Sequence, residues 1–208
     1  MESPLREGGR DDSLRLIETV LWNGKAARRW PLHLARLTRS AAALGWDAPA
    51  PPLLPAPAGP ARLRLTLDRH GVQDWQIHPL PPVKAQWRAA LHPARLDPGD
   101  PWLGVKTTRR QTYDAARAAL PEGLDEWIFA NTRGEVCEGT ITSLFFDRGA
   151  GLRTPPLTCG LLPGVLRAEL ACPEEVLRIE DLPHVDLWCG NALRGLIPLR
   201  LVPQEGAG

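Results

Sequence analysis

The sequence predicts a mixed α/β (α+β) protein made of two domains, and three observations support this fold class. The first half reads as strands around one long helix, and the second half alternates strands with helices. Between them lies PARLDPGDPWLG, a stretch rich in proline, glycine and aspartate that is typical of a domain boundary. With 208 residues and 43% hydrophobic content, the chain can bury a sizeable core. We therefore predict a smaller N-terminal domain at 1–92, a linker at 93–105 and a larger C-terminal, cofactor-binding domain at 106–208.

The N-terminal half opens with a strand, a hairpin and a helix. The first ten residues are polar and are expected to fray, and a strand follows at 13–22. Asn23-Gly24 is a strong hairpin signal, so a return strand is expected at 26–30. Pro31 suits the first turn of a helix that ends at Gly45.

A proline-rich loop separates this opening from a second hairpin. Residues 48–60 contain six prolines, which exclude a regular element and indicate a stiff surface loop. Alternating strands are expected at 61–68 and 72–80, joined by a turn around Arg69-His70-Gly71, with a third strand at 86–92.

The C-terminal half has the alternating pattern of an α/β domain. A helix is expected at 109–120, and a second helix is expected to begin near Pro163. The predicted strands are 126–131, 135–139, 142–147, 174–180, 186–191 and 195–202.

Charge and cysteine content exclude several classes of function. The formal net charge is +1 and the arginines are spread along the chain, so no basic face for nucleic acid or an anionic membrane is expected. No apolar run is long enough to span a membrane, and no leader is seen, which predicts a cytoplasmic protein. The four cysteines form no CxxC pair, so we predict free thiols and no metal site.

One lysine stands out because this chain almost always uses arginine. It has 22 arginines and only three lysines, Lys25, Lys84 and Lys106. A lysine held in a protein site can form a Schiff base with a carbonyl compound such as pyridoxal phosphate. That cofactor also needs an acid at its ring nitrogen and N–H groups or an arginine at its phosphate. A lone lysine is more often a solvent-exposed cation, so Lys106 needs further support.

The sequence offers a candidate for each of these needs. Glu138 ends a predicted strand among apolar residues, where an acid needs a positive partner. Gly164 opens a predicted helix and leaves the N–H groups of Val165 and Leu166 for an anion. Arg36 lies on the first helix between apolar neighbours. Each signal is weak alone, because an acid after a strand or a glycine at a helix start is common.

Taken in order, four segments resemble the class IV aminotransferase family, which includes branched-chain and D-amino-acid aminotransferases and 4-amino-4-deoxychorismate lyase. The family's strand, hairpin and HxxRL helix resemble IETVLWNG with HLARLTRSAAALG, and its lysine segment resembles KTTRRQTYDAA. Its acid-bearing strand pair resembles NTRGEVCEGTITSLFF, and its phosphate loop resembles TPPLTCGLLPGVLR. CGNALRGLIPL is similar to its closing segment, and together these segments cover nearly the whole chain.

The resemblance implies the two-domain D-amino-acid aminotransferase-like fold, with pyridoxal phosphate in the interdomain cleft. It places Lys106 at the Schiff-base position and Glu138 at the ring nitrogen. The phosphate would be bound by Arg36 and by backbone groups of five residues in the C-terminal half: Gly164, Val165, Leu166, Asn191 and Ala192. The resemblance also implies a homodimer that acts on a small-molecule amino substrate.

The sequence departs from the family pattern in a few places. The usual strand and GDG turn before the first Glu-Thr are missing, and Ser143 replaces the usual asparagine. Leu166 replaces a threonine of the phosphate loop, where a backbone N–H can still serve. These departures put the substrate side of the site in more doubt than the cofactor side.

The segments HLARL, KTTRR and NALRG favour the lyase-like members, which release pyruvate to give 4-aminobenzoate for folate synthesis. A D-amino-acid or branched-chain transaminase is the alternative on the same frame. A non-catalytic, degenerate cofactor-binding protein is the third, because of the missing front strand. Candidate substrate-binding residues are Thr19, Thr107 (or Thr108) and Arg109, with Arg95 as an alternative cation.

Overall fold

The computed structural model describes residues 3–203, and the chain divides into two compact units. Unit 1 comprises Met1–Pro82 and Val105–Arg109, and unit 2 comprises Val83–Gly104 and Arg110–Gly208. This division differs from the predicted linker at 93–105. The strand that begins at Trp87 pairs within unit 2, so the chain enters that unit earlier than the Pro/Gly/Asp stretch indicated.

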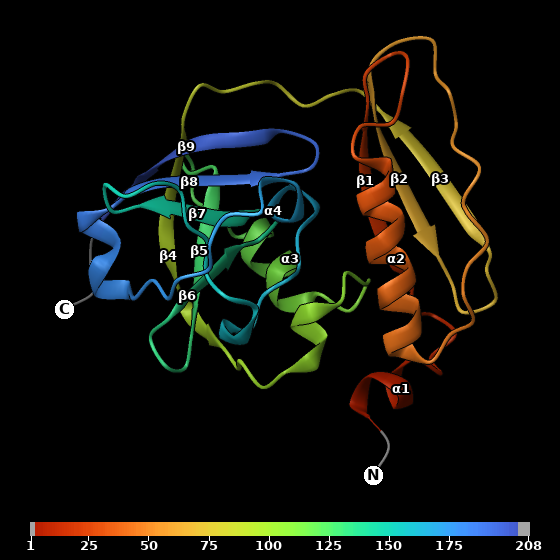
Figure 1. The fold of residues 1–208 in the computed structure, drawn as a ribbon, viewed down its shortest axis with the longest axis horizontal. Coiled ribbons are helices and arrows are strands. Elements are labelled where there is room, and N and C mark those ends of the chain that lie inside the picture. Colours follow the sequence, from red (N-terminus) through yellow and green to blue (C-terminus); the bar gives the residue numbers. More distant parts are fainter. Residues whose placement is uncertain (1–2, 204–208) are drawn as a thin grey trace. The chain divides into compact units, whose positions relative to one another are not determined.

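Unit 1 contains a three-stranded antiparallel sheet of β1 (Leu16–Trp22), β2 (Ala61–Leu67) and β3 (Gln73–His78), in that order (Figure 1). On β2 the residues alternate between buried and half-buried, which is the pattern of a sheet with one covered face. The long helix α2 (Trp30–Leu44) packs on β1. The two hairpin strands predicted at 61–68 and 72–80 are therefore confirmed.

Helix α2 begins and ends as the sequence predicts. Pro31 lies in its first turn, and Gly45 caps its end with φ of 74°, a left-handed conformation that suits glycine. The return strand predicted at 26–30 is wrong, because only one bridge forms, between Trp22 and Ala27, before the helix starts. Helix formation at Trp30 leaves too few residues for a strand.

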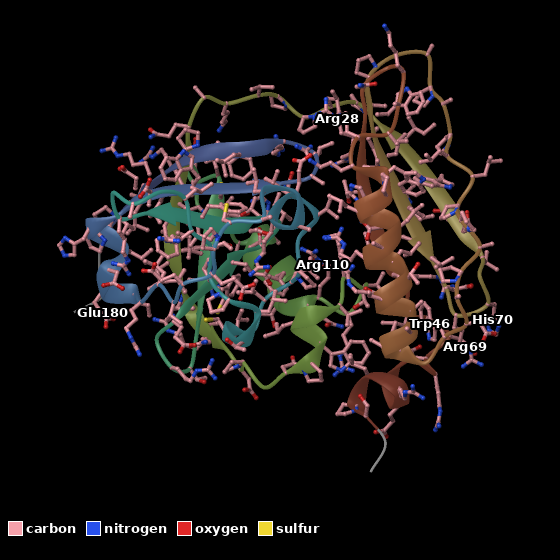
Figure 2. The ribbon with its side chains drawn as sticks, in the orientation of Figure 1. Arg28, Trp46, Arg69, His70, Arg110 and Glu180 are labelled. Atoms are coloured by element: carbon pink, nitrogen blue, oxygen red, sulfur yellow. The ribbon has the colours of Figure 1, made fainter. Side chains whose placement is uncertain are left out.

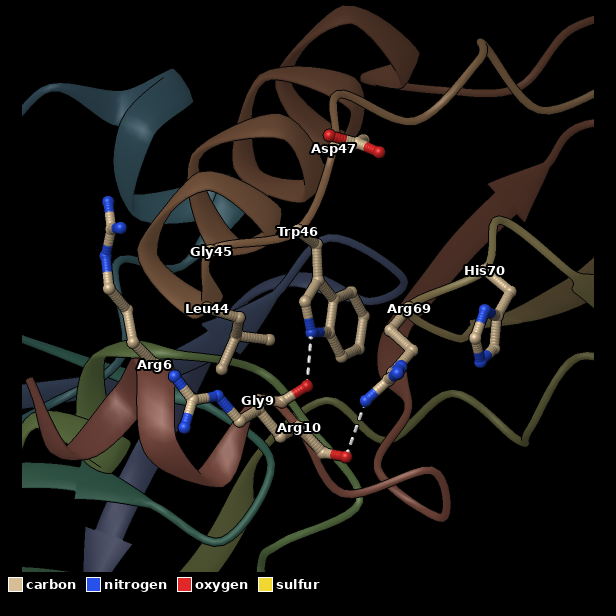
Figure 3. A pocket seen from close by; sticks show the side chains of 9 residues that line it. All are labelled: Arg6, Gly9, Arg10, Leu44, Gly45, Trp46, Asp47, Arg69 and His70. Carbon is tan, nitrogen blue, oxygen red and sulfur yellow. Dashed lines mark hydrogen bonds between the residues drawn. The ribbon is translucent and has the colours of Figure 1, made fainter.

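The N-terminal residues are more ordered than predicted. A short helix, α1 (Pro4–Gly8), buries Leu5 and contacts α2. Just beyond it, the Trp46 indole N–H donates to the Gly9 carbonyl over 2.7 Å (Figure 3). The fraying predicted for the first ten residues is therefore wrong from Ser3 onward, because an apolar side chain anchors the helix.

A short segment from later in the chain extends the sheet of unit 1. Leu16 is bridged to Thr107, flanked by hydrogen bonds from Ile17 N–H to the Lys106 carbonyl and from Thr108 N–H to the Arg15 carbonyl, both 2.9 Å. This antiparallel pattern places Lys106 opposite Ile17. Residues 105–109 therefore lie along the edge of β1 that β2 does not use.

Unit 2 is a closed six-stranded barrel in the order β4-β5-β6-β7-β8-β9 (Figure 1). The last strand closes it by pairing in parallel with the first. Pro93 coincides with a register shift between β4 and β5, since proline donates no ladder hydrogen bond. The strands are β4 (Trp87–Leu96), β5 (Glu126–Asn131), β6 (Val136–Gly139), β7 (Ser143–Asp147), β8 (Asp186–Asn191) and β9 (Gly195–Leu201).

The predicted elements of unit 2 are mostly confirmed. The helices are α3 (Gln111–Ala118) and α4 (Val165–Leu170), with 3₁₀ turns at Pro101–Gly104, Leu157–Cys159 and Ile179–His184. The strand predicted at 174–180 is wrong: this segment makes only bridges at Glu174 and Arg178 before the third 3₁₀ turn. A closed barrel leaves no free edge on which it could extend. The mixed α/β fold class is confirmed. Among the described helices, none is long and apolar enough to span a membrane.

Candidate active site

Lys106 lies on the face of the unit 1 sheet opposite the one that α2 covers. Because it pairs opposite Ile17, its side chain shares a face with Ile17 and Thr19 on β1. Lys106 and Thr19 are both half-buried. The structure therefore brings the predicted Schiff-base lysine and one of the predicted substrate-binding residues onto the same surface of the same unit.

The other predicted substrate-binding residues are placed differently. Thr107 is only 2% exposed and lies on the opposite face, with its hydroxyl accepting from Arg109 N–H at 3.2 Å. Arg109 is exposed in the same segment. Arg95 belongs to unit 2, where its guanidinium donates to the carbonyls of His92 and Pro93. Arg95 is thus occupied by its own loop.

Arg36 lies in a buried cluster of three charged or titratable residues, Glu18, His33 and Arg36. Its Nε donates to Glu18 Oε1 at 2.8 Å and its Nη2 to Oε2 at 2.6 Å. His33 Nδ1 lies 2.6 Å from the same Oε2 and donates to it. Glu18 is 1% exposed and comes from β1, whereas the other two residues come from α2. Because Glu18 and Thr19 alternate, this cluster lies on the sheet face opposite Lys106.

The electrostatics of the cluster favour a charged carboxylate. Burial alone would raise the pKa of Glu18, but the charge of Arg36 and hydrogen bonds from His33 and Arg36 lower this pKa to about 2. Glu18 accepts from both the Nε and the Nη2 of Arg36. Among the described residues, the buried Nε2 of His33 has no hydrogen-bond partner.

Glu138, the predicted acid, is buried at the end of β6 in unit 2. It is 5% exposed, and its Oε1 accepts from the Tyr113 hydroxyl at 2.7 Å. Its Oε2 accepts from Leu162 N–H at 3.2 Å. Burial, then the charge and hydrogen bond of Glu138, raise the pKa of Tyr113, so this phenol stays a donor. The two donors orient the Glu138 carboxylate inside the protein.

The predicted phosphate-binding residues other than Arg36 belong to the same unit as this acid, and Gly164 lies near it. Ser143, which pairs with Glu138 across β6 and β7, lies so close to Gly164 that a Cβ on the glycine would be 2.4 Å from the Ser143 Oγ. Gly164 precedes α4, where no side chain caps the first turn. The N–H groups of Val165 and Leu166, both buried, begin that helix.

Asn191 lies at the end of β8 beside the loop that follows Glu138. Its amide Nδ2 donates to the Ile141 carbonyl at 3.1 Å, and its Oδ1 accepts from Leu193 and Arg194 N–H. The side chain is therefore used within the protein, so any contact of this segment with a ligand would come from backbone groups here or at the buried Ala192.

The loop at 139–142 is held from inside by Glu126, a residue that the sequence did not indicate. Glu126 is 1% exposed and accepts from Thr140 N–H at 3.0 Å, Ile141 N–H at 3.3 Å and the Thr142 hydroxyl at 2.9 Å. Arg110, labelled in Figure 2, donates from outside to the Thr140 carbonyl at 2.9 Å. The loop next to Glu138 is therefore fixed on both sides.

Sequence reasoning missed Glu18, Tyr113 and Glu126, although two of them carried a signal. Glu18 alternates with Leu16 and Val20 on β1, so an acid on the apolar face of a strand should have been matched with a buried cation. Tyr113 is the only tyrosine of the chain and follows Lys106 by seven residues. Nothing local distinguishes Glu126, whose donors come from a loop fourteen residues later.

The residues present fit pyridoxal phosphate. Unit 2 by itself contains an oriented buried carboxylate of the kind that a pyridine nitrogen requires and uncapped helix N–H groups of the kind that a phosphate requires, and unit 1 by itself contains the half-buried amine of Lys106. Among residues 3–203, no group of three or more His, Cys, Asp and Glu side chains could hold a metal. The four cysteines are free, and Cys137, Cys159 and Cys189 are buried.

Comparison with known proteins agrees with this chemistry. A model of the amino-transferase class IV family matches residues 15–202. A candidate aminodeoxychorismate lyase of Schizosaccharomyces pombe is 29% identical over 168 residues, covering 74% of this chain and 72% of that protein. The crystal structure of a candidate amino-acid aminotransferase from Mesorhizobium loti matches with TM-score 0.85 and 43% identity, covering 91% of this chain and all (100%) of that one.

More distant structures share the fold. The 4-amino-4-deoxychorismate lyase of Pseudomonas aeruginosa matches with TM-score 0.78 and 20% identity, covering 98% of this chain and 88% of that chain. The family match spans most of the sequence and includes every predicted site residue. The chain therefore belongs to the class IV aminotransferase family and is a pyridoxal-phosphate-dependent aminotransferase or lyase.

Proposed function

We propose that this chain acts as a 4-amino-4-deoxychorismate lyase, eliminating pyruvate from its substrate to leave 4-aminobenzoate. The observation that carries the chemistry is the buried Glu138 carboxylate, oriented by Tyr113 and by Leu162 N–H. The cofactor, when bound, supplies an electron sink for the carbon that bears the substrate amine. The S. pombe relative supports the choice of reaction.

We assign a separate role in the reaction to each of the predicted site residues. Lys106 would hold the cofactor through its amine; once the substrate amine has displaced that bond, the freed lysine amine would act as the general base for the substrate proton. Glu138 keeps the ring nitrogen protonated, since a carboxylate favours a neighbouring positive charge. The N–H groups of Val165 and Leu166, beside Gly164, bind the phosphate.

The family resemblance would add phosphate contacts from Arg36 and from the backbone at Asn191 and Ala192. On the substrate side, Thr19 has the favourable position, because it shares the face of Lys106. Arg109 is an exposed cation in the lysine segment, and Thr107 supports that segment through its hydroxyl.

An amino-acid transaminase is the second candidate, favoured by the 43% identity to the M. loti protein. The two reactions differ in what they need and release. A lyase forms pyruvate and 4-aminobenzoate from 4-amino-4-deoxychorismate without a second substrate, whereas a transaminase must use an α-keto acid to return its cofactor to the aldehyde form. Stoichiometric pyruvate release without an added keto acid would establish the lyase. Turnover that depends strictly on a keto acid would establish the transaminase instead.

The cofactor assignment is tested by absorbance and chemical trapping. Purified protein given pyridoxal phosphate should turn yellow, and borohydride should fix the cofactor to the peptide that contains Lys106. Lys106→Ala should abolish the fixation, and Lys25→Ala, at an exposed lysine of the same unit, should not change it. Fixation at Lys25 or Lys84, or no uptake of cofactor, would refute the assignment.

Two further properties belong to the proposal through the family resemblance. We expect a homodimer in the cytoplasm, and sedimentation of the purified protein would test the first of these. A protein that turns yellow but has neither lyase nor transaminase turnover would instead support a degenerate cofactor-binding protein.

A further inference from the structure

A cavity opens in unit 1 where α1, the end of α2 and the β2–β3 turn meet (Figure 3). Its volume is about 390 Å³, which is at the small end of the range for ligand pockets. All of its lining residues belong to unit 1, and none of them is a residue predicted for the cofactor or the substrate. The cavity is therefore a candidate for a second binding site.

Two glycines bring the walls of this cavity together. Gly9, which follows α1, is buried against the end of α2, and a Cβ on it would overlap the Leu44 carbonyl oxygen. Gly45 ends α2 in the left-handed conformation, and a Cβ there would be 3.5 Å from Cγ of Arg6. The side chain of Arg6 therefore passes over the end of α2 and reaches the cavity.

The β2–β3 turn supplies a second cation. Asp68 shapes this turn, because its Oδ1 accepts from His70 N–H at 2.9 Å and from Val72 N–H at 2.8 Å. The turn presents Arg69 and His70 to the cavity (Figure 3). The Arg69 guanidinium also donates to the Arg10 carbonyl at 2.7 Å, which ties the turn to the segment after α1. Arg69 is thereby held at the cavity.

Positive charge is concentrated in the lining. Three of the nine lining residues are arginines, against 22 of the 208 residues of the chain, and the lining contains one acid, Asp47. Among the residues that the structure describes, no acid forms an ion pair with Arg6. Nε of Arg69 lies 3.1 Å from Asp12, which is 76% exposed. Such an exposed ion pair is weak, so Arg69 can exchange Asp12 for an anionic ligand.

An aromatic ring forms one wall of the cavity. Trp46 follows the end of α2 and is half-buried, and its indole N–H donates to the Gly9 carbonyl at 2.7 Å. This hydrogen bond fixes the orientation of the indole, and the buried Leu44 lines the cavity with it (Figure 3). An indole that is fixed in place and partly exposed suits the stacking of a planar ring.

The arginines of the lining come from separate segments: Arg6 from α1, Arg10 from the residues after it, and Arg69 from the β2–β3 turn. One guanidinium can satisfy both oxygens of a carboxylate, whereas a phosphomonoester presents three terminal oxygens that several guanidinium groups can share. The charge of the lining therefore suits a phosphate group better than a single carboxylate.

We propose that this cavity binds a phosphomonoester that carries a planar ring, with its phosphate at Arg6, Arg10 and Arg69 and its ring on Trp46. No lysine lines the cavity, so the ligand is held without a covalent bond. A mononucleotide and a phosphorylated pyridine such as pyridoxal phosphate share this chemistry. The inference goes beyond the proposed function and does not depend on it.

The test is calorimetric titration of the protein after treatment with pyridoxal phosphate and borohydride, which occupies the proposed cofactor site. The ligands are adenosine 5′-monophosphate, pyridoxine 5′-phosphate, which has no aldehyde, and ribose 5-phosphate, which has no planar ring. At least one ring-bearing phosphate should bind about 5-fold or more tightly than ribose 5-phosphate, because only a planar ring can stack on Trp46. The tighter of the two identifies the source, and equal affinity for them would mean that the cavity recognises only the phosphate and a ring.

Variants locate the binding. Arg6→Gln and Arg69→Gln should each weaken binding of the preferred phosphate about 10-fold, because each removes a charged donor. Arg39→Gln, at an exposed arginine of α2 outside the cavity, is the matched control and should bind like wild type. Arg6→Lys and Arg69→Lys keep the charge but lose the forked donor, so they should retain part of the affinity. They take the place of a glutamine variant that fails to fold.

The inference is overturned if no ring-bearing phosphate binds more tightly than ribose 5-phosphate. It is also overturned if the variants at Arg6 and Arg69 bind like Arg39→Gln, since the ligand then lies elsewhere. The proposed function is read separately, from fixation of the cofactor at Lys106. A protein that fixes no cofactor but binds a ring-bearing phosphate through Arg6 and Arg69 would refute the function and support the cavity, and the reverse result would refute the cavity alone.

Discussion

Glu18 in unit 1 and Glu126 in unit 2 are equally buried, each 1% exposed, but the protein stabilises them in different ways. Glu18 faces a guanidinium and an imidazole, so an opposite charge balances it. Glu126 mainly accepts from neutral groups, the N–H groups of residues 127, 140 and 141 and two threonine hydroxyls, with Arg117 at 3.4 Å. A carboxylate can therefore be buried by ion pairing or by many dipoles.

The difference reflects what each residue holds in place. Glu18 connects β1 to α2, and Arg36 of that helix donates two hydrogen bonds to its carboxylate. Glu126 organises a loop whose N–H groups point inward and would otherwise be unpaired. The ion pair of Glu18 thus connects two regular elements, whereas the hydrogen bonds that Glu126 accepts from neutral groups hold an irregular loop in place.

The largest expected effect is at the ion pair. Glu18→Gln leaves Arg36 buried without its counter-ion and should lower the free energy of unfolding by about 3–5 kcal/mol. Hydrogen exchange should show the loss first in the amides of α2. Glu7→Gln, at an exposed acid of unit 1, is the control and should change stability by less than about 0.5 kcal/mol. A loss as small as the control's would show that the cluster contributes little.

Acid should remove the contribution of Glu18 to stability. The pKa of Glu18 is lowered from 4.5 to about 2 in the folded protein, so its contribution is complete above about pH 4.5 and is lost as the pH falls toward 2. Between about pH 4.5 and pH 2 the wild type should lose roughly 3 kcal/mol of its free energy of unfolding, a contribution that Glu18→Gln lacks at every pH. Urea unfolding at a series of pH values measures the difference in unfolding free energy between wild type and Glu18→Gln, which should become smaller as the pH falls. A difference that stays constant from pH 5 to 2 would contradict the ion-pair account.

A smaller effect is expected at the dipole-held acid. Glu126→Gln replaces one acceptor oxygen by an NH₂ group that cannot accept from the loop, which should cost about 2–3 kcal/mol. Exchange should quicken at the Thr140 and Ile141 amides, with α2 unaffected. Glu122→Gln, exposed just before β5, is the control. Protection of the loop amides equal to wild type would show that the surrounding backbone, not Glu126, fixes the loop.

The smallest expected effect concerns the candidate catalytic acid. Tyr113→Phe removes one donor to Glu138 and leaves Leu162 N–H, so unfolding should become easier by about 1.5 kcal/mol. Affinity for pyridoxal phosphate should fall as the carboxylate loses its orientation, and equilibrium dialysis measures this. Unchanged affinity would mean that Tyr113 supports stability alone.

The sequence was most informative where a pattern is local. The alternation in β2, the proline and glycine at the ends of α2, and the strand pair around Gly134 each depend on neighbouring residues. The return strand at 26–30 and the strand at 174–180 failed because a strand also needs a free edge, which the local sequence does not reveal.

The candidate site, too, could be predicted only where its residues belong to a local sequence pattern. Family-like segments indicated Lys106, Glu138 and Gly164; the structure places Glu138 on β6, Gly164 immediately before α4 and Lys106 in the segment that lies along β1. The contacts of the buried acids around the site were not predictable, because Glu18 meets Arg36 across eighteen residues and Glu126 meets Thr140 across fourteen. Such pairs depend on tertiary packing, and only the presence of an acid on an apolar strand face hinted at one of them.

Closure of the barrel has a consequence for how the chain matures on the ribosome. The first strand of the barrel, β4, pairs with β9, which follows the other five barrel strands in sequence and is synthesised after them, and Val202 N–H also donates to the Ala89 carbonyl. Until β9 leaves the exit tunnel, the backbone N–H and C=O groups on one edge of β4 remain unpaired and can associate with other chains. We therefore expect nascent chains that stop before Gly195 to remain protease-sensitive and to need chaperone protection.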